Sequence, residues 1–250
     1  MRAISFRLSG KSACFRKPDV NEYAYFTYNN IHKPALLGLL GAIVGYGGYT
    51  QLYNSNKGVK KGSLEYNDRY MEYYEKLKNL KVSIVPLAKN GYFSKKIQIF
   101  NNSVGYASFE TGGNLVVREQ WLENPAWEVL ILDDSSDEFS KIKEYLLSKK
   151  AVFIPYLGKN EHFANIDSPK TIELDTPKGN IIDSLFIKNF DELGWAKEDE
   201  IPYFFQEISP YSLHKEYHFY EYKPMVFTNQ ELEVIPELTY GYDGKNYSFI

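Results

Sequence analysis

An apolar run of eleven residues, from Pro34 to Val44, constrains the fold of this chain more than any other feature. The run (PALLGLLGAIV) carries no charged side chain, so a helix built from it is apolar on most sides and has to be buried in a core. Pro34 suits a helix start, where its missing N–H leaves no hydrogen bond unmade. Spanning a bilayer takes roughly 20 apolar residues. The run therefore predicts a buried helix and no membrane association.

Three glycines interrupt this predicted helix or follow it. Gly38, Gly41 and Gly45 lower the intrinsic helicity of the segment. We therefore expect neighbouring backbone to approach the helix closely at these positions.

The segments around the helix alternate between strand and helix patterns. Ile4, Phe6 and Leu8 alternate with Ser5 and Arg7, which is typical of a half-buried strand with one polar face. Further patterns are helical over 66–80 and 136–149, and strand-like over 81–87, 127–132 and 152–154. Ser135 and Glu138 have the spacing of a capping box for the second of these helices. The order strand, helix, strand, strand, helix, strand predicts an α+β, ferredoxin-like domain.

Residues 92–121 interrupt this order and have the pattern of β-hairpins. Ile97 and Ile99 alternate before a predicted turn at Asn101–Ser103, and a second turn is predicted over 111–114. Beyond residue 170 the chain is aromatic and rich in proline, and we expect mostly β-structure. The predicted organisation is a domain over 1–170, with the hairpin inserted at about 92–121, and a β-rich extension over 171–250.

The charges are unevenly distributed along the chain. Residues 1–61 hold nine Lys or Arg and two acidic residues, a net charge of +7, and because the whole chain carries −3 the remainder carries −10. A basic segment of this kind indicates a surface for a polyanion, and the acidic remainder suggests protein partners. Two solvated faces of opposite sign would produce the same count.

Cysteine and histidine usage excludes several kinds of site. Cys14 is the only cysteine, so neither an intrachain disulfide nor a zinc site built on cysteines can form, which agrees with a cytoplasmic location. Basic residues interrupt the amino terminus, which excludes a signal peptide. His214 and His218 are four residues apart, but their segment has a strand pattern and no third ligand is evident. We expect no metal and no cofactor.

Three groups of residues are candidates for binding or chemistry. The loop Gly45–Gly48 could cradle a phosphate, or Gly45 could simply end the helix as its C-cap. Tyr28, His32 and Lys33 could provide general acid–base catalysis on RNA, or phosphate contacts and helix capping. Lys95, Lys96 and Arg118 lie among aromatic residues of the hairpin, which suits single-stranded RNA but also suits a strand edge protected by lysines.

Four sequence segments resemble the CRISPR-associated Cas-five family, a branch of the RAMP proteins. They are RAISFRLSGKSACFRKP, FTYNNIHKPALLGLLGAIVGYGG, VVREQWLENPAWEVLILD and PYLGKNEHFA. The first two form a specific match over roughly 50 residues, weaker agreement extends to about residue 170, and the aromatic style is closest to the type I-B subgroup.

This resemblance implies an RRM-like domain with a protruding hairpin called the thumb. It implies a subunit of the Cascade surveillance complex that binds the 5′ handle of the CRISPR RNA, contacts the large subunit and the backbone subunits, and meets target DNA near the PAM. The implied RNA-binding residues are Arg7, Lys11, Arg16, Lys33, Gly45, Tyr46, Gly47, Gly48, Lys95, Lys96, Arg118, Lys159 and His162.

One departure from the family bears on catalysis. The catalytic type I-C relatives cleave precursor RNA with a tyrosine and an adjacent Lys-His pair near the thumb. This chain has no histidine between His32 and His162. We therefore expect a subunit that binds RNA and is not an enzyme, with a metal-independent endoribonuclease acting through Tyr28, His32 and Lys33 as the alternative.

Overall fold

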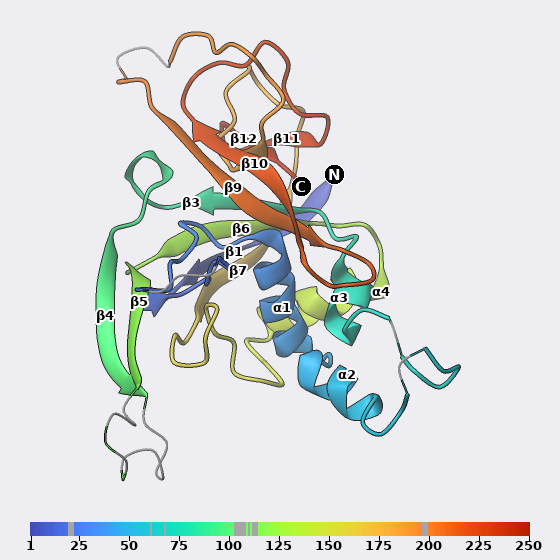
Figure 1. The fold of residues 1–250 in the computed structure, drawn as a ribbon. Helices are drawn as coiled ribbons and strands as arrows, with labels where there is room; N and C mark the ends of the chain where they lie inside the picture. Colours follow the sequence, from blue (N-terminus) through green and yellow to red (C-terminus); the bar gives the residue numbers. More distant parts are fainter. Residues whose placement is uncertain are drawn as a thin grey trace.

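A four-stranded antiparallel sheet forms the centre of the fold (Figure 1). The computed structural model describes residues 1–19, 23–60, 62–67, 69–102, 109, 111, 115–196 and 200–250. The strands of the sheet are β1 (Arg2–Ser9), β3 (Val82–Pro86), β6 (Ala126–Leu132) and β7 (Asn165–Glu173), in the order β3-β6-β1-β7. The strands predicted over 2–8, 81–87 and 127–132 are confirmed, and the chain is α+β as expected.

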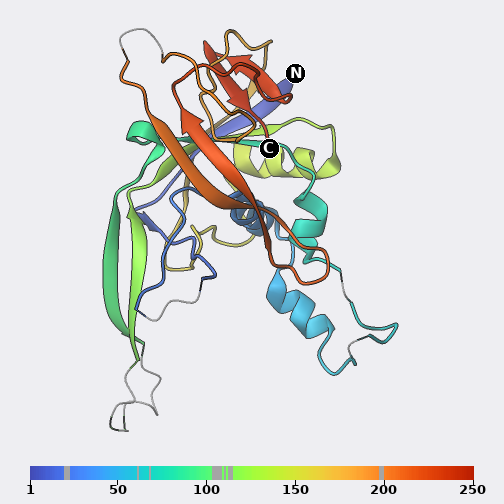
Figure 2. The same ribbon diagram turned by 45° about the horizontal axis from the view of Figure 1, so that its top comes forward.

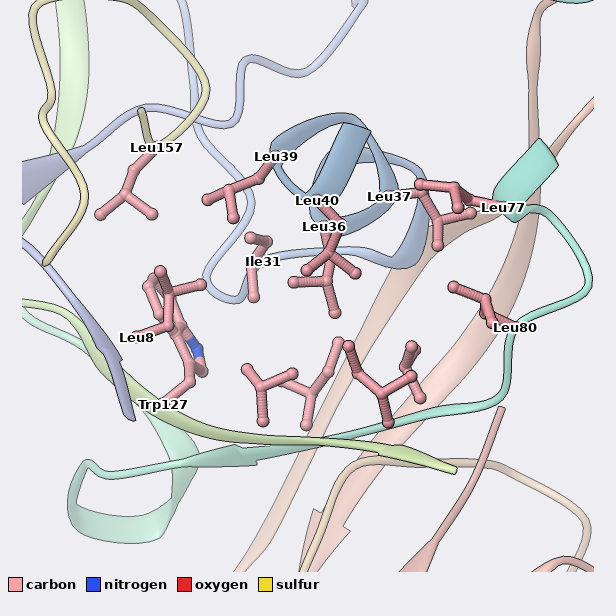
Figure 3. Close-up of a cluster of buried hydrophobic side chains, with 14 of the residues drawn as sticks. Leu8, Ile31, Leu36, Leu37, Leu39, Leu40, Leu77, Leu80, Trp127 and Leu157 are labelled. Atoms are coloured by element: carbon pink, nitrogen blue, oxygen red, sulfur yellow. The ribbon is translucent and has the colours of Figure 1, made fainter. Parts of the chain in front are cut away.

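Helices cover one face of this sheet. They are α1 (Lys33–Val44), α3 (Glu72–Leu77) and α4 (Asp137–Leu147). The apolar side chains Ile4, Phe6 and Leu8 of β1 belong to the same buried cluster as the leucines of α1 (Figure 3). The core therefore lies between α1 and the sheet, and the predicted burial of the apolar run is confirmed.

The opposite face of the sheet is covered by the end of the chain. The hairpin of β11 (Thr239–Tyr242) and β12 (Lys245–Ser248) supplies Tyr247 and is followed by Phe249; both pack with Ala3 and Leu130. Ile250 exchanges two backbone hydrogen bonds with Val82 of β3. This pairing covers an edge of the sheet that would otherwise have unpaired backbone groups.

A second sheet crosses the helical side of the molecule (Figure 2). It contains β8 (Phe186–Ile187), β9 (Phe204–Leu213) and β10 (Tyr220–Thr228), in the order β8-β10-β9. Backbone atoms of Leu213 in β9 hydrogen-bond the hydroxyls of Tyr70 and Tyr74, which attaches the sheet to α3. All regular elements among the described residues after 170 are strands, as predicted, and loops connect them.

A third sheet extends away from the body (Figure 1). It consists of β2 (Ser12–Ala13), β5 (Leu115–Glu123) and β4 (Lys95–Asn102), and a short 3₁₀ helix, η1 (Lys89–Gly91), precedes β4. β4 and β5 pair from Lys95 with Leu122 to Asn102 with Leu115. The turn predicted at Asn101–Ser103 is wrong, because β4 continues through Asn102. The predicted turn over 111–114 lies mostly outside the described residues.

Three further sequence predictions need correction. Helix α2 (Tyr49–Ser55) was not predicted, and the helix predicted over 66–80 is reduced to α3. The N-cap of α4 is Ser136, whose hydroxyl accepts the Phe139 N–H, and Ser135 instead has a positive φ of 62°. The sequence pattern alone does not show which of the two adjacent serines, Ser135 or Ser136, is the N-cap.

The segment 152–154 is not the final strand of the sheet. Val152, Phe153 and Ile154 are about half or more exposed, and β7 takes the edge position. The N–H groups of Val152 and Phe153 donate to the carbonyls of Ile43 and Ala42. These are carbonyls of the last turn of α1, which have no partner within the helix. The backbone of Val152 and Phe153 thus provides hydrogen-bond donors to the carboxyl end of α1.

Close approach explains the glycine in the middle of α1. A Cβ atom at Gly41 would lie 2.5 Å from Cβ of Tyr73 on α3, whereas one at Gly38 would meet the Tyr73 ring at an ordinary 3.7 Å. The expectation of a close neighbour is confirmed at Gly41, where that neighbour is a side chain of α3.

Lys33 points into the core, although it was expected to bind RNA. Its side chain is buried, and Nζ donates to the carbonyl of Ile250 at 3.1 Å. Burial, helped by the charge of Lys81, lowers the pKa of Lys33 to about 8. This lysine therefore tethers α1 to Ile250, two residues beyond β12, and offers no surface cation.

The described residues contain no single helix that is long and apolar enough to cross a membrane. Taken together, α1 and α2 have the length and apolar composition of a membrane span, but the two helices are bent by 75° at the break between them.

Gly41→Ala should destabilise the protein, and Gly38→Ala is its matched control. The new methyl group at residue 41 overlaps Tyr73, and overpacking of this kind costs about 1–3 kcal/mol. At residue 38 the methyl group has room, so the higher helix propensity of alanine should leave stability unchanged or raise it by up to about 1 kcal/mol. Urea unfolding of both variants measures the difference. Equal midpoints would contradict the proposed contact.

Lys33→Met should stabilise the protein near pH 7 and flatten its pH dependence. The pKa of Lys33 is lower in the folded state, so the unfolded state binds more protons between about pH 8 and 10.5. Wild-type stability should therefore rise through that window, and the full cost of the buried charge is present below it. Methionine removes this cost, on the order of 3 kcal/mol at most. Unfolding free energies from pH 7 to 9.5 test this, and parallel curves would refute it.

Candidate nucleic-acid interface

A groove of about 700 Å³ lies between α1, the β4–β5 hairpin and the loop that follows β2. Most of its large side chains are aromatic. They are Phe15, Tyr25, Tyr49, Tyr73, Phe100, Tyr156 and Tyr220. Ring faces of this kind are suitable platforms for unstacked bases.

Small residues of α1 form the floor of the groove. Ala35, Gly38 and Ala42 share one face of the helix and are only partly buried, while the leucines point to the core. The helix that is apolar on most sides therefore presents its least bulky face outward. The groove is deep at this point because Ala35, Gly38 and Ala42 have small side chains or none.

Arg16 lies in the groove wall and stacks on Tyr25. Its guanidinium carbon is 3.3 Å from the centroid of the ring. Tyr25 is fixed by two backbone hydrogen bonds to β5, one to the carbonyl of Arg118 and one from the N–H of Gln120. Arg16 is exposed and has no ion pair among the described residues. A planar cation held this way can contact a phosphate or stack on a base.

Lys159 also reaches the groove, but carboxylates occupy its amine. Nζ lies 2.9 and 3.0 Å from the oxygens of Glu119 and 2.7 Å from Glu161. Burial would lower the pKa of Lys159, but hydrogen bonds and charges of the two glutamates outweigh it and raise the pKa. Glu119 is buried and also accepts the indole N–H of Trp121. Lys159 therefore ties its segment to β5.

Gly158 allows this segment to pack tightly. It has a φ of +88°, and a Cβ atom there would lie 2.0 Å from the carbonyl oxygen of Cys14. A hydrogen bond from the Cys14 N–H to the carbonyl of Leu157 fixes the two segments. The sequence PYLGKNEHFA is thus a structural wall of the groove.

His162 lies behind this wall. It is buried, its Nδ1 is 2.7 Å from the Ser12 hydroxyl, and its ring meets Trp121 edge-on at 4.6 Å. Burial is the main cause that lowers the pKa of His162, so the imidazole is neutral at pH 7. Its position is that of a packing residue that supports Trp121.

The hairpin presents its basic residues on two faces. Lys96 pairs with Trp121, and alternation along the strands puts both on the side of Phe100 and the groove. Lys95 and Arg118 lie on the other side. The Lys96 amine is 5.8 Å from the Trp121 ring centroid, and the Lys95 amine is 4.9 Å from that of Tyr92.

The glycine loop is engaged by the protein itself. Gly45 is left-handed and caps α1, so the alternative of a helix C-cap is confirmed. The N–H of Gly47 donates to a carboxylate oxygen of Glu72 at 2.8 Å, and that of Gly48 donates to Gln51 at 2.9 Å. The bond from Gly47 is the main cause that lowers the pKa of Glu72. The loop binds an anion, as its sequence suggested, but the anion is a side chain of α3.

Tyr46 lies beside this loop. Its ring has the amine of Lys76 at 4.2 Å and that of Lys141 at 4.5 Å. Both amines belong to the protein, so this ring already has cationic partners.

Arg7 and Lys11 lie outside the groove. Arg7 is exposed on the face of β1 opposite to α1, in register with Glu128 and Asp167. Lys11 is exposed in the loop after β1. The residues predicted to bind RNA therefore do not form one surface, and the groove brings together only Arg16 and Lys159, with Lys96 on its hairpin side.

The predicted acid–base trio is buried. Nδ1 of His32 accepts the Ala35 N–H and caps α1, and aromatic rings of Phe15, Tyr28 and Tyr220 surround the imidazole. Burial lowers the pKa of His32 to about 3. Among the described residues, no group of three or more His, Cys, Asp or Glu side chains is arranged to hold a metal ion.

Sequence reasoning missed most of the groove. Tyr49, Tyr73, Tyr156 and Tyr220 come from four separate segments, and Glu119 was not singled out. The signal available was the high tyrosine content of 22 residues, which does not reveal which rings gather in one place.

Comparisons with known proteins agree with the fold that the sequence suggested. Neither a protein-family profile nor a curated protein sequence matches this chain. A chain of a CRISPR RNA-guided surveillance complex is similar in structure, with 12% identity, a TM-score of 0.50, and coverage of 92% of this chain and 90% of that one. A CRISPR protein from Archaeoglobus fulgidus has 11% identity, a TM-score of 0.46, and coverage of 99% and 98%. The predicted resemblance is thus confirmed at the level of the fold, which is that of a CRISPR-associated surveillance-complex chain.

Proposed function

We propose that this chain is a non-catalytic subunit of a CRISPR Cascade complex, of type I-B, that holds the 5′ handle of the CRISPR RNA in the groove beside α1. The single observation that carries this proposal is the groove lined by aromatic side chains, with Arg16 stacked on Tyr25 and without an ion pair among the described residues. Single-stranded RNA is recognised by stacking of splayed bases and by cations near the backbone. The fold of a surveillance-complex chain supports this assignment.

In this proposal the β4–β5 hairpin is the thumb. Its groove side carries Phe100, Trp121 and Lys96, and it extends from the body of the protein. The sheet order β3-β6-β1-β7, with α1 and α4 on one face, supports a ferredoxin-like, RRM-like domain. Residue 170, the proposed end of this domain, lies within β7.

The other partners are proposed from the same resemblance. They are the large subunit, the backbone subunits and target DNA near the PAM, in a cytoplasmic complex. Exposed apolar side chains on the strands, such as Ile99 of β4 and Ile208 of β9, provide surface for protein contacts.

The burial of His32 argues for the binding role and against catalysis. A general acid or base at neutral pH needs a pKa near that pH, whereas that of His32 is about 3. Lys33 turns its amine away to Ile250. The geometry therefore favours capping and packing for these residues.

Arg16→Ala should weaken RNA binding, with Arg7→Ala as the matched control. Both arginines are exposed, but only Arg16 lies in the groove. We expect a roughly tenfold loss of affinity for repeat-derived single-stranded RNA, and a decrease in the salt slope of about 0.7 for one lost phosphate contact. Fluorescence anisotropy at several salt concentrations measures both. An equal loss in the two variants, or in neither, would contradict the groove assignment.

Purified protein should leave repeat RNA intact in EDTA. The control is His32→Asn, which retains an oxygen to cap α1. Cleavage by the wild-type chain that is abolished in His32→Asn would replace the binding role with that of an endoribonuclease. Gel analysis of labelled RNA distinguishes the two results.

A further inference from the structure

A second and larger cleft, of about 1510 Å³, lies between α2 and the turn that joins β9 to β10. One wall is α2 with Tyr49 and Tyr53. The base is lined by Glu75 of α3, by Lys78 at its C-cap, and by Gly62, Ser63, Tyr66, Asn67, Arg69 and Tyr70. The opposite wall is the β9–β10 turn, from His214 to His218. Both ribbon views place α2 and this turn on the same side of the molecule (Figures 1 and 2).

Tyr49 joins this second cleft to the groove. It is the first residue of α2, it lines both cavities, and it is 55% exposed. A chain that leaves the groove beside α1 can therefore continue over the Tyr49 ring into the second cleft. A ring with two open sides is a suitable point for such a passage, because one base can stack on it.

Aromatic rings and cations both line the second cleft. Tyr53 is 68% exposed, and Tyr66 and Tyr70 lie across from it. The ring of His214, which also lines the cleft, is held by stacking on Tyr217 at 5.2 Å with planes 19° apart. The rings of Tyr53, Tyr66, Tyr70 and His214 extend the series of aromatic side chains found in the groove.

The charges of the cleft favour an anion. Its cations are Arg69, Lys78 and Lys215, and its acids are Glu75 and Glu216. Lys78 is paired with Glu75 at 2.9 Å, which leaves two cations against one acid.

We propose that the second cleft holds the continuation of the single-stranded RNA that enters from the groove, with bases on Tyr53 and Tyr66 and phosphates near Arg69 and Lys215. This inference rests on the proposed function of the groove. The volume exceeds the roughly 300–1,000 Å³ of ordinary small-molecule sites, which fits a polymer segment. A lining of tyrosine, histidine and cations is that of a stacking site for nucleic acid.

The test measures how the effect of each substitution on RNA affinity depends on the length of the RNA. Fluorescein-labelled oligouridylates of 4 and 12 nucleotides are titrated against the full chain, the double variant Tyr53→Ala/Tyr66→Ala, and Arg16→Ala. We expect the double variant to bind the 12-mer at least tenfold more weakly and the 4-mer normally. Arg16→Ala should weaken both. The matched control Tyr53→Phe/Tyr66→Phe retains the rings and should bind as the wild type does, and thermal melts verify that each variant is folded.

The outcomes separate this inference from the function on which it rests. If only Arg16→Ala weakens binding, the second cleft is not part of the RNA path and the groove assignment stands. If no variant changes affinity at either length, both proposals fail. If the double variant keeps RNA affinity but loses a protein subunit from the purified complex, the cleft is a protein contact and the RNA path is overturned.

Discussion

Burial of the helix α1 determines how the rest of the molecule is arranged. Its leucines require a sheet beneath them, and Gly41 allows Tyr73 of α3 to approach α1 at a distance that no larger residue would permit. The ends of the helix are closed by His32 and by the backbone of Val152 and Phe153. The face with Ala35, Gly38 and Ala42 is only partly buried and lines the groove. The groove therefore forms where an apolar helix presents its least bulky face.

Carboxylates from distant segments bind to parts of the basic amino-terminal region. Glu207 of β9 accepts the Asn29 N–H with both oxygens, at 3.1 and 3.0 Å, and lies 3.7 Å from Lys17. Burial is the main cause that raises its pKa, and the Asn29 hydrogen bonds and the lysine charges oppose this. Glu72 likewise occupies the glycine loop. Several of the acids that gave the remainder of the chain its charge of −10 therefore serve as internal partners for the basic segment.

Local patterns allowed three strands of the main sheet and two helices to be predicted, because their periodicity depends on neighbouring residues. The strand at 2–8 and the helix at 34–44 are examples. Contacts between distant segments could not be read in this way. Asn165–Glu173 became the fourth strand in place of 152–154, and its alternation is masked by exposed polar residues. The same limit applied to the prediction of the groove. Arg16 was predicted from its charge, but its stacking on Tyr25 and the ion pair between Lys159 and Glu119 arise only in the folded chain.

This distribution of charge bears on how such a groove can recognise RNA. Of the predicted basic residues, Lys33 is buried and Lys159 is held by two glutamates, so neither can neutralise a phosphate without breaking its own contacts. Arg16 and Lys96 remain at the groove, each beside an aromatic ring. Neutralisation by two cations gives only a shallow salt dependence. Stacking on the aromatic walls must therefore supply most of the affinity. It depends on ring position and so on the elements that carry the rings, such as α3 with Tyr73, β4 with Phe100 and β10 with Tyr220.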